Sequence, residues 1–560
     1  MTFVYICGII YKDDRVRIYE RVTIQGMAER KIDKKAIIAL IAIMLLQIAM
    51  HIWVGAQKTG YHIDESFSYM LANSHDYPLI SWNRDVWENW CSGSDFLEFM
   101  TVQEGEGFDY GMVYYNQTMD VHPPLFYWLL HTISSMHPDS FSKWYGFALN
   151  IPFMLGTTLF IYLIAWKLFD DERWRICAAA FWAFSHMALD VAGFIRMYMM
   201  ATFFFTAFVY VALNIIEKGV SAKRLAPLGI IIYLGSMTHY YFIVAAGIGS
   251  VILLIPMLRK REFRKAIAYS AVALGAVALF CVSFPYVFWH LFWSETNVVG
   301  TNLRKHAFDL LGWVNVTFIM TFDLASHTLA HGLVSLIAVS AGTLAFVVYY
   351  CFFYSRKASD QDKAWKKNAA FRYCGWTFLV SFVAITFISG LYPYIRYLYP
   401  IMPIGSLVVL YIAKSTLLTK AKADKIAPTC IAVLSSINMI LSVGTGTQSY
   451  LQPEQADAIA ALEEYHDTPL IVAAESIETL YATIPEFLPL LSEFDHIYIA
   501  HRDDIGADGI INEALDDYGS CVIYAIPNVF EGDPDYPLDG VDGAEHICGL
   551  LGAEFRIIRR

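Results

Sequence analysis

Five short clusters of ionisable and aromatic residues interrupt an otherwise apolar sequence, each beside a long apolar segment. Ionisable groups in such places are costly unless they have a role. A positioned carboxylate can remove a proton from a hydroxyl, and a fixed guanidinium can stabilise the charge of a phosphate. The clusters are Tyr61-His62-Ile63-Asp64-Glu65-Ser66, Asp120-Val121-His122-Pro123-Pro124-Leu125-Phe126-Tyr127-Trp128, Gly193-Phe194-Ile195-Arg196-Met197-Tyr198, Thr238-His239-Tyr240-Tyr241 and Tyr394-Ile395-Arg396-Tyr397-Leu398-Tyr399-Pro400.

Each cluster also has a purely structural interpretation. Asp64 and Glu65 could cap a helix, and the prolines after His122 suit a first helical turn. Arg396 could reach the lipid headgroups, and His239 could pack within the protein. The tyrosines Tyr240 and Tyr241 fit an interfacial aromatic belt.

Composition identifies the setting of these clusters as a membrane. The chain has 560 residues, of which 57% are hydrophobic and only 16% charged. Soluble proteins carry about 25% charged residues, so a soluble enzyme and a disordered chain are both excluded. The net charge of −12 gives no indication of a nucleic-acid partner.

The apolar segments predict about eleven transmembrane helices in an all-α polytopic protein. Basic residues gather in alternate turns, which places the N-terminus in the cytoplasm of a multi-pass plasma-membrane protein. All five clusters then lie at the outer face, where Arg196 and Arg396 run against the positive-inside bias. The expected spans are 36–56, 145–168, 176–191, 198–216, 225–240, 241–258, 266–289, 331–354, 373–391, 400–414 and 426–443.

Two further regions are expected outside the membrane. The first outer loop, residues 57–143, is too polar for a simple span, and Val121 to Met136 predicts a helix at the interface. The tail after residue 450 holds 23 acidic and only 4 basic residues. Its helical stretches alternate with short apolar runs, which predicts a small α/β domain. The predicted division is a cytoplasmic segment 1–35, a transmembrane domain 36–449 and an extracytoplasmic domain 450–560.

The order and common sidedness of the clusters resemble the membrane glycosyltransferases of the GT-C fold. The likeness rests on the acidic pair after the first span, HPPLFYWLL, RMY, THYY and RYLYPIMP, and covers most of residues 36–410. It is strongest to the bacterial aminoarabinose transferases and to relatives of the protein O-mannosyltransferases. The acidic tail is outside the resemblance.

The resemblance implies a transferase that takes a sugar from a polyprenyl-phosphate carrier at the outer side of the membrane. Asp64, with Glu65 beside it, matches the position of the proposed catalytic base. Arg396 is the first candidate to bind the carrier phosphate and Arg196 the second. The other candidate substrate-binding residues are His122, Tyr198, His239, Tyr240 and Tyr397.

The partners then expected are the lipid-linked sugar, the bilayer and a hydroxyl acceptor on a lipid, glycan or protein, with no nucleic acid. No cofactor is required, although a divalent metal ion could supply part of the positive charge. Its candidate ligands are His62, Asp64, Glu65, His122 and His239, whose spacing dictates no metal geometry.

Other classes of function remain open at this point. A transporter or lipid-linked-sugar flippase is the main alternative, and it would favour paired repeats with broken helices at the midplane. A structural or sensory membrane protein would explain the tail but not the five clusters. A polysaccharide polymerase would differ from the transferase only in its acceptor.

Overall fold

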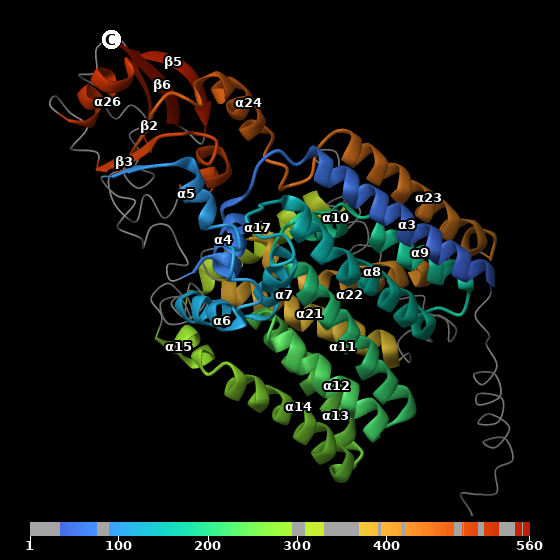
Figure 1. Cartoon of the computed structure of the whole chain (residues 1–560). Helices are drawn as coiled ribbons and strands as arrows, with labels where there is room; N and C mark the ends of the chain where they lie inside the picture. Colours follow the sequence, from blue (N-terminus) through green and yellow to red (C-terminus); the bar gives the residue numbers. More distant parts are fainter. Residues whose placement is uncertain are drawn as a thin grey trace, which may run out of the picture.

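The structure is a computed structural model, and it is mostly helical with a small sheet near the C-terminus (Figure 1). It describes residues 34–75, 89–293, 309–329, 369–389, 394–416, 421–474, 484, 486–501, 509–525, 544–550 and 553–560. The predicted combination of a polytopic helical body with a small C-terminal sheet is therefore confirmed.

Eight helical segments within the described ranges are long and apolar enough to cross a membrane. They are α3 (Lys34–Gln57), α8 (Lys143–Leu168), α11 (Tyr198–Lys218), α13 (Tyr240–Arg259), α14 (Phe263–Ser283), α21 (Ala369–Ser389), the continuous η4 (Ile395–Ile401) and α22 (Met402–Thr416), and α23 (Ala421–Gly444).

Two of the expected spans have a different form, and a third is not among the described residues. The span expected at 176–191 is a bent pair, α9 (Glu172–Ala183) and α10 (His186–Gly193), which meet at 50°. The span at 225–240 is the shorter helix α12 (Ala222–Ser236). The one expected at 331–354 lies outside the described residues. In addition, the helix α17 (Leu310–Leu329) lies outside all of the expected spans.

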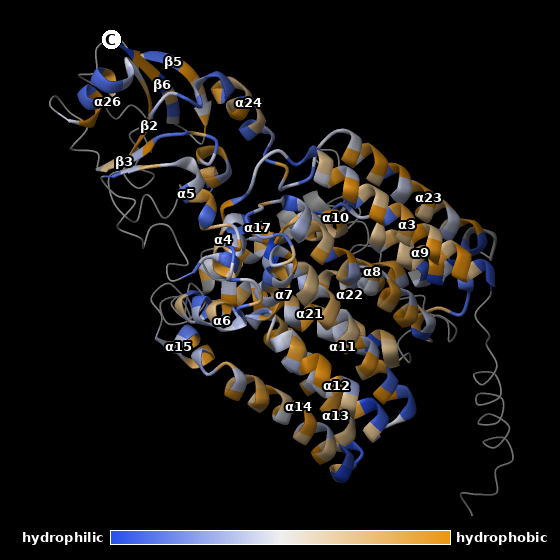
Figure 2. Ribbon diagram, viewed as in Figure 1, coloured by the Kyte–Doolittle hydropathy of each residue, from blue (hydrophilic) through white to orange (hydrophobic). Residues whose placement is uncertain are grey.

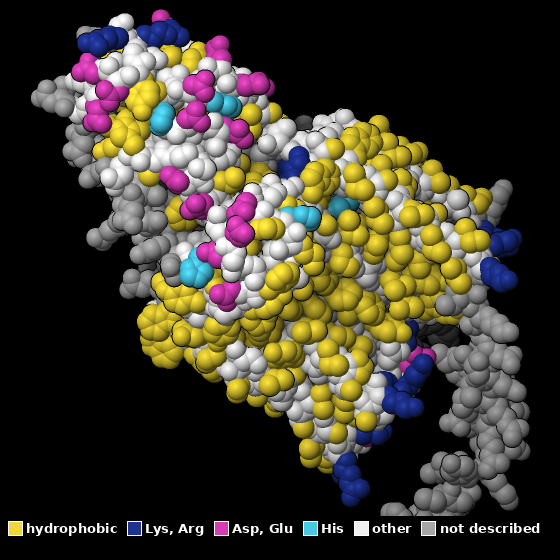
Figure 3. All heavy atoms as spheres, in the orientation of Figure 1, with side chains coloured by type: hydrophobic (Ala, Val, Ile, Leu, Met, Phe, Trp, Pro, Cys, Tyr) yellow, Lys and Arg dark blue, Asp and Glu magenta, His cyan; other side chains and the backbone are white. Residues whose placement is uncertain are grey.

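Helix α11 is the centre of the bundle, and most of its side chains are buried among the neighbouring helices. Helix α14 shows the opposite pattern: Leu274 and Val282 are 69% and 78% exposed. Exposed apolar side chains gain nothing from contact with water, so this outer surface of α14 is suited to contact with lipid. The hydropathy colouring shows apolar residues along the helices of the bundle, and the space-filling view shows a broad apolar surface on the face of the bundle in view (Figures 2 and 3).

The first outer loop folds against one end of the bundle as a set of short helices. These are α4 (Ile63–Asn73), α5 (Gly93–Glu98), α6 (Tyr110–Met119) and α7 (Leu125–Ser134). Helix α7 begins after the two prolines of the second cluster, inside the stretch predicted to form an interfacial helix. A further short helix, α15 (Tyr286–Phe292), follows α14.

The C-terminal unit, residues 450–560, contributes five strands to a six-stranded sheet in the order β1-β3-β2-β4-β6-β5, in which β1 is Trp90–Cys91. Strand β2 pairs in parallel with β3 and β4, and the other pairings are antiparallel. Its elements are α24 (Pro453–Leu462), η5 (Glu463–Tyr465), β2 (Leu470–Ala474), β3 (Ile497–His501), α26 (Ile510–Tyr518), β4 (Ser520–Ala525), β5 (Glu545–Leu550) and β6 (Ala553–Arg559).

The edge strand β1 (Trp90–Cys91) comes from the first outer loop, far from the other strands in sequence. Its Trp90 pairs with Tyr498 of β3, and the Trp90 indole donates to Glu513 at 3.2 Å. The amide of Gly93, just after the strand, donates to the backbone oxygen of Phe494. The outer loop and the C-terminal unit are therefore joined through one sheet.

Candidate active site

Asp64 lies in the first turn of α4, and its neighbours fix that turn. The His62 ring nitrogen accepts from the Asp64 amide at 3.1 Å, while the Glu65 carboxylate accepts from the His62 amide at 2.9 Å. This reciprocal capping satisfies two amides that a helix start leaves without partners. The local sequence His-Ile-Asp-Glu thus sets where the Asp64 side chain emerges from the helix.

The carboxylate of Asp64 faces two guanidinium groups. Arg396 Nη1 lies 2.8 Å from Asp64 Oδ2, and Arg196 Nη2 lies 3.6 Å from Oδ1. Burial alone would raise the pKa of the Asp64 carboxyl, but the two arginines, Arg196 first, outweigh burial and lower that pKa from 3.8 to about 2. Asp64 is therefore ionised, and it is held between two positive charges.

Arg196 is positioned by the chain reversal between α10 and α11, and it is almost fully buried. Its Nη1 donates to the Tyr127 hydroxyl of α7 at 3.0 Å and lies 3.4 Å from the Ser68 hydroxyl of α4. A buried arginine needs such partners because an uncompensated buried charge is very costly. Arg196 thereby connects the third cluster to the first two.

Arg396 lies in the first turn of η4, and its guanidinium stacks over aromatic rings. Its central carbon is 4.2 Å from the ring centre of Tyr394 and 5.8 Å from that of Tyr397. Stacking fixes the plane of the group while leaving its edge for hydrogen bonding. Within the described ranges, its Nε has no hydrogen-bond partner, so Arg396 retains capacity for an anionic ligand.

His122 and His239 lie side by side near this pair. Their ring centres are 5.9 Å apart, and the Tyr198 ring is 5.1 Å from that of His239. His122 Nδ1 is 2.6 Å from Asp120 Oδ2, which orients its ring. Burial alone would raise the pKa of Asp120, but neighbouring His122 lowers it overall. The second, third and fourth clusters therefore meet around these rings.

The two tyrosines after His239 lie on different sides. The ring centre of Tyr241 lies 4.8 Å from that of Tyr397, so Tyr241 borders the Arg396 region. The Tyr240 hydroxyl is 2.8 Å from the His290 ring of α15 and packs with a separate apolar group around Phe284. Among the residues expected to bind substrate, Tyr240 therefore contacts this separate group, whereas Tyr241 packs beside Tyr397.

Glu65 is fully buried, and its carboxylate has three donors. Lys58 Nζ is 2.6 Å from Oε2, the His62 amide is 2.9 Å from the same oxygen, and the Ile195 amide is 3.0 Å from Oε1. The Ile195 contact ties α4 to the residue before Arg196. Glu65 therefore connects the start of α4 to the segment that carries Arg196. Asp64 is the carboxylate that lies beside the arginines.

Several contacts of the site were not singled out from the sequence. Asp120 and Tyr127 lie inside the second cluster; Asp120 contacts His122, and Tyr127 accepts from the buried Arg196. Tyr450 follows the last span and stacks 3.9 Å from Phe194, with the His62 ring 5.7 Å away. The sequence carries no signal for Tyr450, because it follows a span without a distinctive pattern.

A metal site is not formed among the described residues, where no three His, Cys, Asp or Glu side chains converge to hold an ion. Of the expected ligands, Asp64 and His62 are 3.8 Å apart, and Glu65 is engaged by Lys58. The positive charge at Asp64 is supplied by Arg196 and Arg396.

Comparison with known proteins gives likenesses of structure only. No family model and no curated protein sequence matches the chain. ArnT from Cupriavidus metallidurans bound to undecaprenyl phosphate is 10% identical over 93% of this chain and 97% of that one, with a TM-score of 0.47. The Archaeoglobus fulgidus oligosaccharyltransferase is 12% identical over 87% of this chain and 69% of that one, with a TM-score of 0.44.

The Pmt1-Pmt2 protein O-mannosyltransferase complex of S. cerevisiae, bound to the sugar donor, is 15% identical over 48% of this chain and 36% of that one, with a TM-score of 0.33. At such identities and scores, these likenesses assign no activity to this chain.

Proposed function

We propose that this protein is a membrane glycosyltransferase that moves a sugar from a polyprenyl-phosphate carrier to a hydroxyl acceptor. The observation that carries the proposal is the ionised Asp64 between Arg396 and Arg196, at one end of an apolar helical bundle. A lipid-linked sugar phosphate has three parts, namely an isoprenoid tail, an anionic phosphate and a polar sugar. The bundle, the arginines and the carboxylate match these parts one by one.

The reaction exchanges one carbon–oxygen bond for another. The acceptor oxygen bonds to the anomeric carbon of the sugar as the bond from that carbon to the phosphate oxygen breaks. Asp64 accepts the proton of the acceptor hydroxyl, and the carrier phosphate leaves with the bonding electron pair. A positioned base contributes typically 10²–10⁴-fold to such a step, and an arginine stabilises the negative charge that collects on the phosphate.

Arg396 contributes, together with Arg196, to the low basicity of Asp64 in this scheme. While Arg396 pairs with Asp64, the carboxylate is a weak base with a pKa of about 2. A phosphate that binds Arg396 competes for the same guanidinium edge and weakens that ion pair. The pKa of Asp64 then rises toward its ordinary value, so the base becomes effective when the sugar donor is in place.

The remaining residues of the site suit the sugar and the phosphate. His122, His239 and Tyr198 present rings and polar atoms beside the arginines, and Tyr397 borders Arg396. Aromatic rings pack against the apolar faces of sugars while polar edges hydrogen-bond their hydroxyls. Tyr127 and Ser68 keep Arg196 in place.

The proposed orientation places the site on the outer side of the plasma membrane and the N-terminus in the cytoplasm. In the space-filling view, Lys and Arg gather at the end of the bundle farther from the C-terminal unit, whereas Asp and Glu gather on and beside that unit (Figure 3). The positive-inside rule assigns the basic end to the cytoplasm. Asp64, near the other end, then faces the outer headgroup region.

A transporter is the second candidate, favoured by the bent pair α9 and α10. Broken helices often carry substrate sites in transporters, and His186 and Asp190 lie 3.3 Å apart within this pair. However, Asp190 also holds the Ser449 hydroxyl at 2.6 Å, which gives it a structural role. A transporter would move a lipid-linked sugar from one leaflet of a proteoliposome membrane to the other without forming a glycosylated product.

The test is transfer of a labelled sugar from polyprenyl-phosphate donors to acceptors in membranes that contain the protein. Asp64→Asn keeps the shape of the side chain and removes the base. We expect transfer to fall by about 10²–10⁴-fold while the variant remains folded. Transfer at the native rate by Asp64→Asn, or transport without transfer by the native protein, would overturn the proposal.

A further inference from the structure

The segment that leads into the catalytic turn, residues 58–63, is held along its length by the part of the chain that follows the last span. We propose that this C-terminal clamp, defined here as Ser449, Tyr450, Leu451, Gln452, Gln455 and Glu486, positions Asp64 for catalysis. The proposal rests on the transferase function given above. Glu486 and Gln455 would then be positioning residues contributed by the acidic C-terminal unit.

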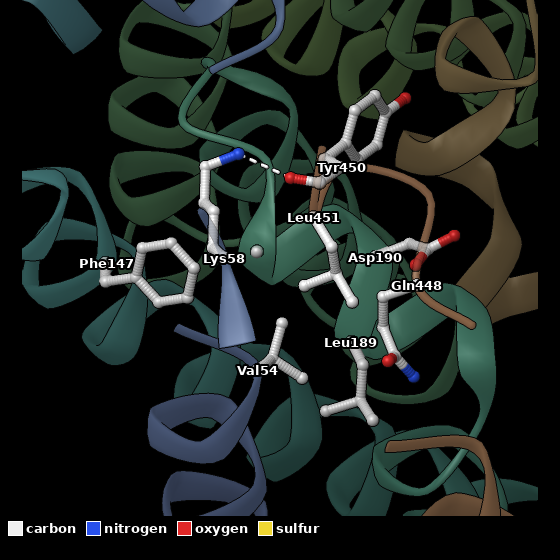
Figure 4. Close-up of a pocket in the computed structure, with 9 residues that line it drawn as sticks. Val54, Lys58, Phe147, Leu189, Asp190, Gln448, Tyr450 and Leu451 are labelled. Atoms are coloured by element: carbon white, nitrogen blue, oxygen red, sulfur yellow. Dashed lines mark hydrogen bonds between the residues drawn. The ribbon is translucent and has the colours of Figure 1, made fainter. Parts of the chain in front are cut away.

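The first contacts of the clamp are made by backbone. The Thr59 amide donates to the Leu451 oxygen at 3.0 Å, and the Thr59 hydroxyl donates to the Gln452 oxygen at 2.8 Å. Lys58, just before, donates to the backbone oxygen of Tyr450, as Figure 4 shows. Two consecutive residues of the leading segment are thereby tied to three consecutive residues of the clamp.

Lys58 connects this backbone contact to the site. Its ammonium binds both Tyr450 and the Glu65 carboxylate, and it is fully buried with Glu65. The cavity beside Lys58, shown in Figure 4, has a volume of only about 10 Å³, which is room for about one water molecule. The contact is therefore closely packed, and a shift of the clamp would be transmitted to Glu65.

The side-chain amide of Gln455 pairs with both backbone groups of Tyr61. Its oxygen accepts from the Tyr61 amide at 3.2 Å, and its nitrogen donates to the Tyr61 oxygen at 3.1 Å. The neighbouring Gly60 makes this approach possible, because a Cβ there would lie 2.0 Å from the Gln455 oxygen. Residue 60 must therefore be glycine for the clamp to close in this form.

Glu486 makes the last contact, one residue before Asp64. Its carboxylate accepts from the Ile63 amide at 3.0 Å, and this amide is the first of α4. A helix start leaves such amides without intrahelical partners, and a carboxylate there is favoured by the helix dipole. Glu486 therefore stabilises the turn from which the Asp64 side chain projects.

The far end of the clamp is anchored to the bundle. The Asp190 carboxylate accepts from the Ser449 amide at 3.1 Å and from its hydroxyl at 2.6 Å. The clamp thus joins α10, next to Arg196, to the residues that precede Asp64. Catalytic groups must be held within a fraction of an ångström of their productive positions, and a misplacement of 1 Å can cost about 10²-fold in rate.

The experiment compares Glu486→Ala and Glu486→Gln with Glu493→Ala, which removes an exposed carboxylate from the same C-terminal unit. For each full-length protein, we would measure the kcat of transfer, the dissociation constant for a polyprenyl phosphate and hydrogen exchange at residues 62–66. We expect Glu486→Ala to lower kcat about 10- to 100-fold, to leave phosphate binding within about twofold, and to speed exchange at Ile63. The glutamine should retain most activity because its amide oxygen still accepts, and Glu493→Ala should match the native protein.

A second perturbation comes from the opposite side of the contact. Gly60→Ala should displace Gln455 and reproduce the loss of kcat with phosphate binding retained. Native kcat and native exchange in Glu486→Ala would overturn the proposal, as would equal losses in Glu486→Gln and Glu486→Ala. If the native protein transferred no sugar, the proposed function would fail, while exchange at Ile63 in the same variants would still decide whether Glu486 holds this turn.

Discussion

Arg396 Nη1 lies 2.8 Å from Asp64 Oδ2, although the two residues come from opposite ends of the transmembrane part of the sequence. The carboxylate belongs to the short helix α4 after the first span, and the guanidinium belongs to η4 at the start of a late span. Arg196 approaches the other carboxylate oxygen at 3.6 Å. The central feature of the molecule is thus an anion that two cations hold at one end of an apolar bundle.

Removal of the Arg396 guanidinium should weaken binding of the sugar donor more than binding of the acceptor. Truncating one partner of a buried charge pair typically costs about 2–5 kcal/mol, so Arg396→Ala should raise the dissociation constant for a polyprenyl phosphate roughly 30-fold or more. The measurement is a binding titration in detergent micelles. Arg259→Ala, which removes an exposed arginine at the basic end, is the matched control and should bind normally. If the native and Arg396→Ala proteins bound the polyprenyl phosphate with equal affinity, Arg396 would not be the residue that binds the phosphate.

The pH dependence of transfer should show that the pKa of Asp64 differs between the free enzyme and the donor complex. With Arg396 paired, the pKa of Asp64 is about 2, so the acid limb of kcat/KM for the sugar donor should lie well below pH 4. Phosphate binding withdraws Arg396 and raises the pKa of Asp64, so the acid limb of kcat should lie at higher pH. Arg396→Ala should move the kcat/KM limb upward as well. If the acid limbs of kcat and kcat/KM coincided in the native enzyme, the phosphate would not compete with Asp64 for Arg396.

The same depressed pKa has a consequence for stability. The folded-state pKa of Asp64 lies below its unfolded value, so its ion pairs stabilise the protein fully above about pH 4 and are lost as the pH falls toward 2. Asp64→Asn should therefore be less sensitive to acid than the native protein over this window, which thermal unfolding at stepped pH would show. If the difference in stability between the native protein and Asp64→Asn were the same at pH 6 and pH 3, the ion pairing of Asp64 would be contradicted.

Lys58 and Glu65 form a buried pair whose loss should affect stability more than chemistry. Lys58→Met leaves the Glu65 charge buried with only amide donors, and breaking such a pair typically costs about 3–5 kcal/mol. Glu65→Gln keeps an acceptor for Ile195 or His62 and should retain far more transfer activity than Asp64→Asn when assayed below its unfolding temperature. Denaturant unfolding and transfer assays measure the two effects. Parallel loss of activity in Glu65→Gln and Asp64→Asn would give Glu65 a direct chemical role.

The orientation can be tested with cysteines introduced at the two ends of the molecule. Glu463→Cys lies on the C-terminal unit and Lys260→Cys lies in the basic turn after α13, and both side chains are exposed. A membrane-impermeant maleimide added to intact cells should label the first and not the second, measured against the native protein as background. Labelling of Lys260→Cys alone would invert the proposed topology.

Much of the helical body could be predicted from the sequence because bilayer-spanning segments are long, apolar and flanked by basic residues. The cluster around Asp64 was also visible, since charged residues beside apolar segments stand out. Their arrangement could not be derived in the same way: whether Arg196 and Arg396 reach the same carboxylate depends on how α4, α11 and η4 pack, which hydropathy does not encode.

The contribution of the C-terminal unit was invisible in the sequence for a different reason. Gln455, Glu486 and Tyr450 belong to an acidic stretch without a recognisable motif. Gln455 and Glu486 contact backbone groups of Tyr61 and Ile63, and Tyr450 contributes its own backbone oxygen to Lys58. Backbone contacts of this kind leave no pattern in the partner sequence. Similarly, β1 is too short for its pairing with β3 to be predicted from alternation of residues.

The most direct test of the account is an experimental structure of the protein with a bound polyprenyl phosphate. We predict that a phosphate oxygen lies within hydrogen-bond distance of Arg396, that the isoprenoid tail runs along the apolar surface of the bundle, and that Asp64 faces the site of the sugar. A phosphate bound at the basic end of the bundle, with Asp64 and Arg396 still paired and remote from the lipid, would contradict it.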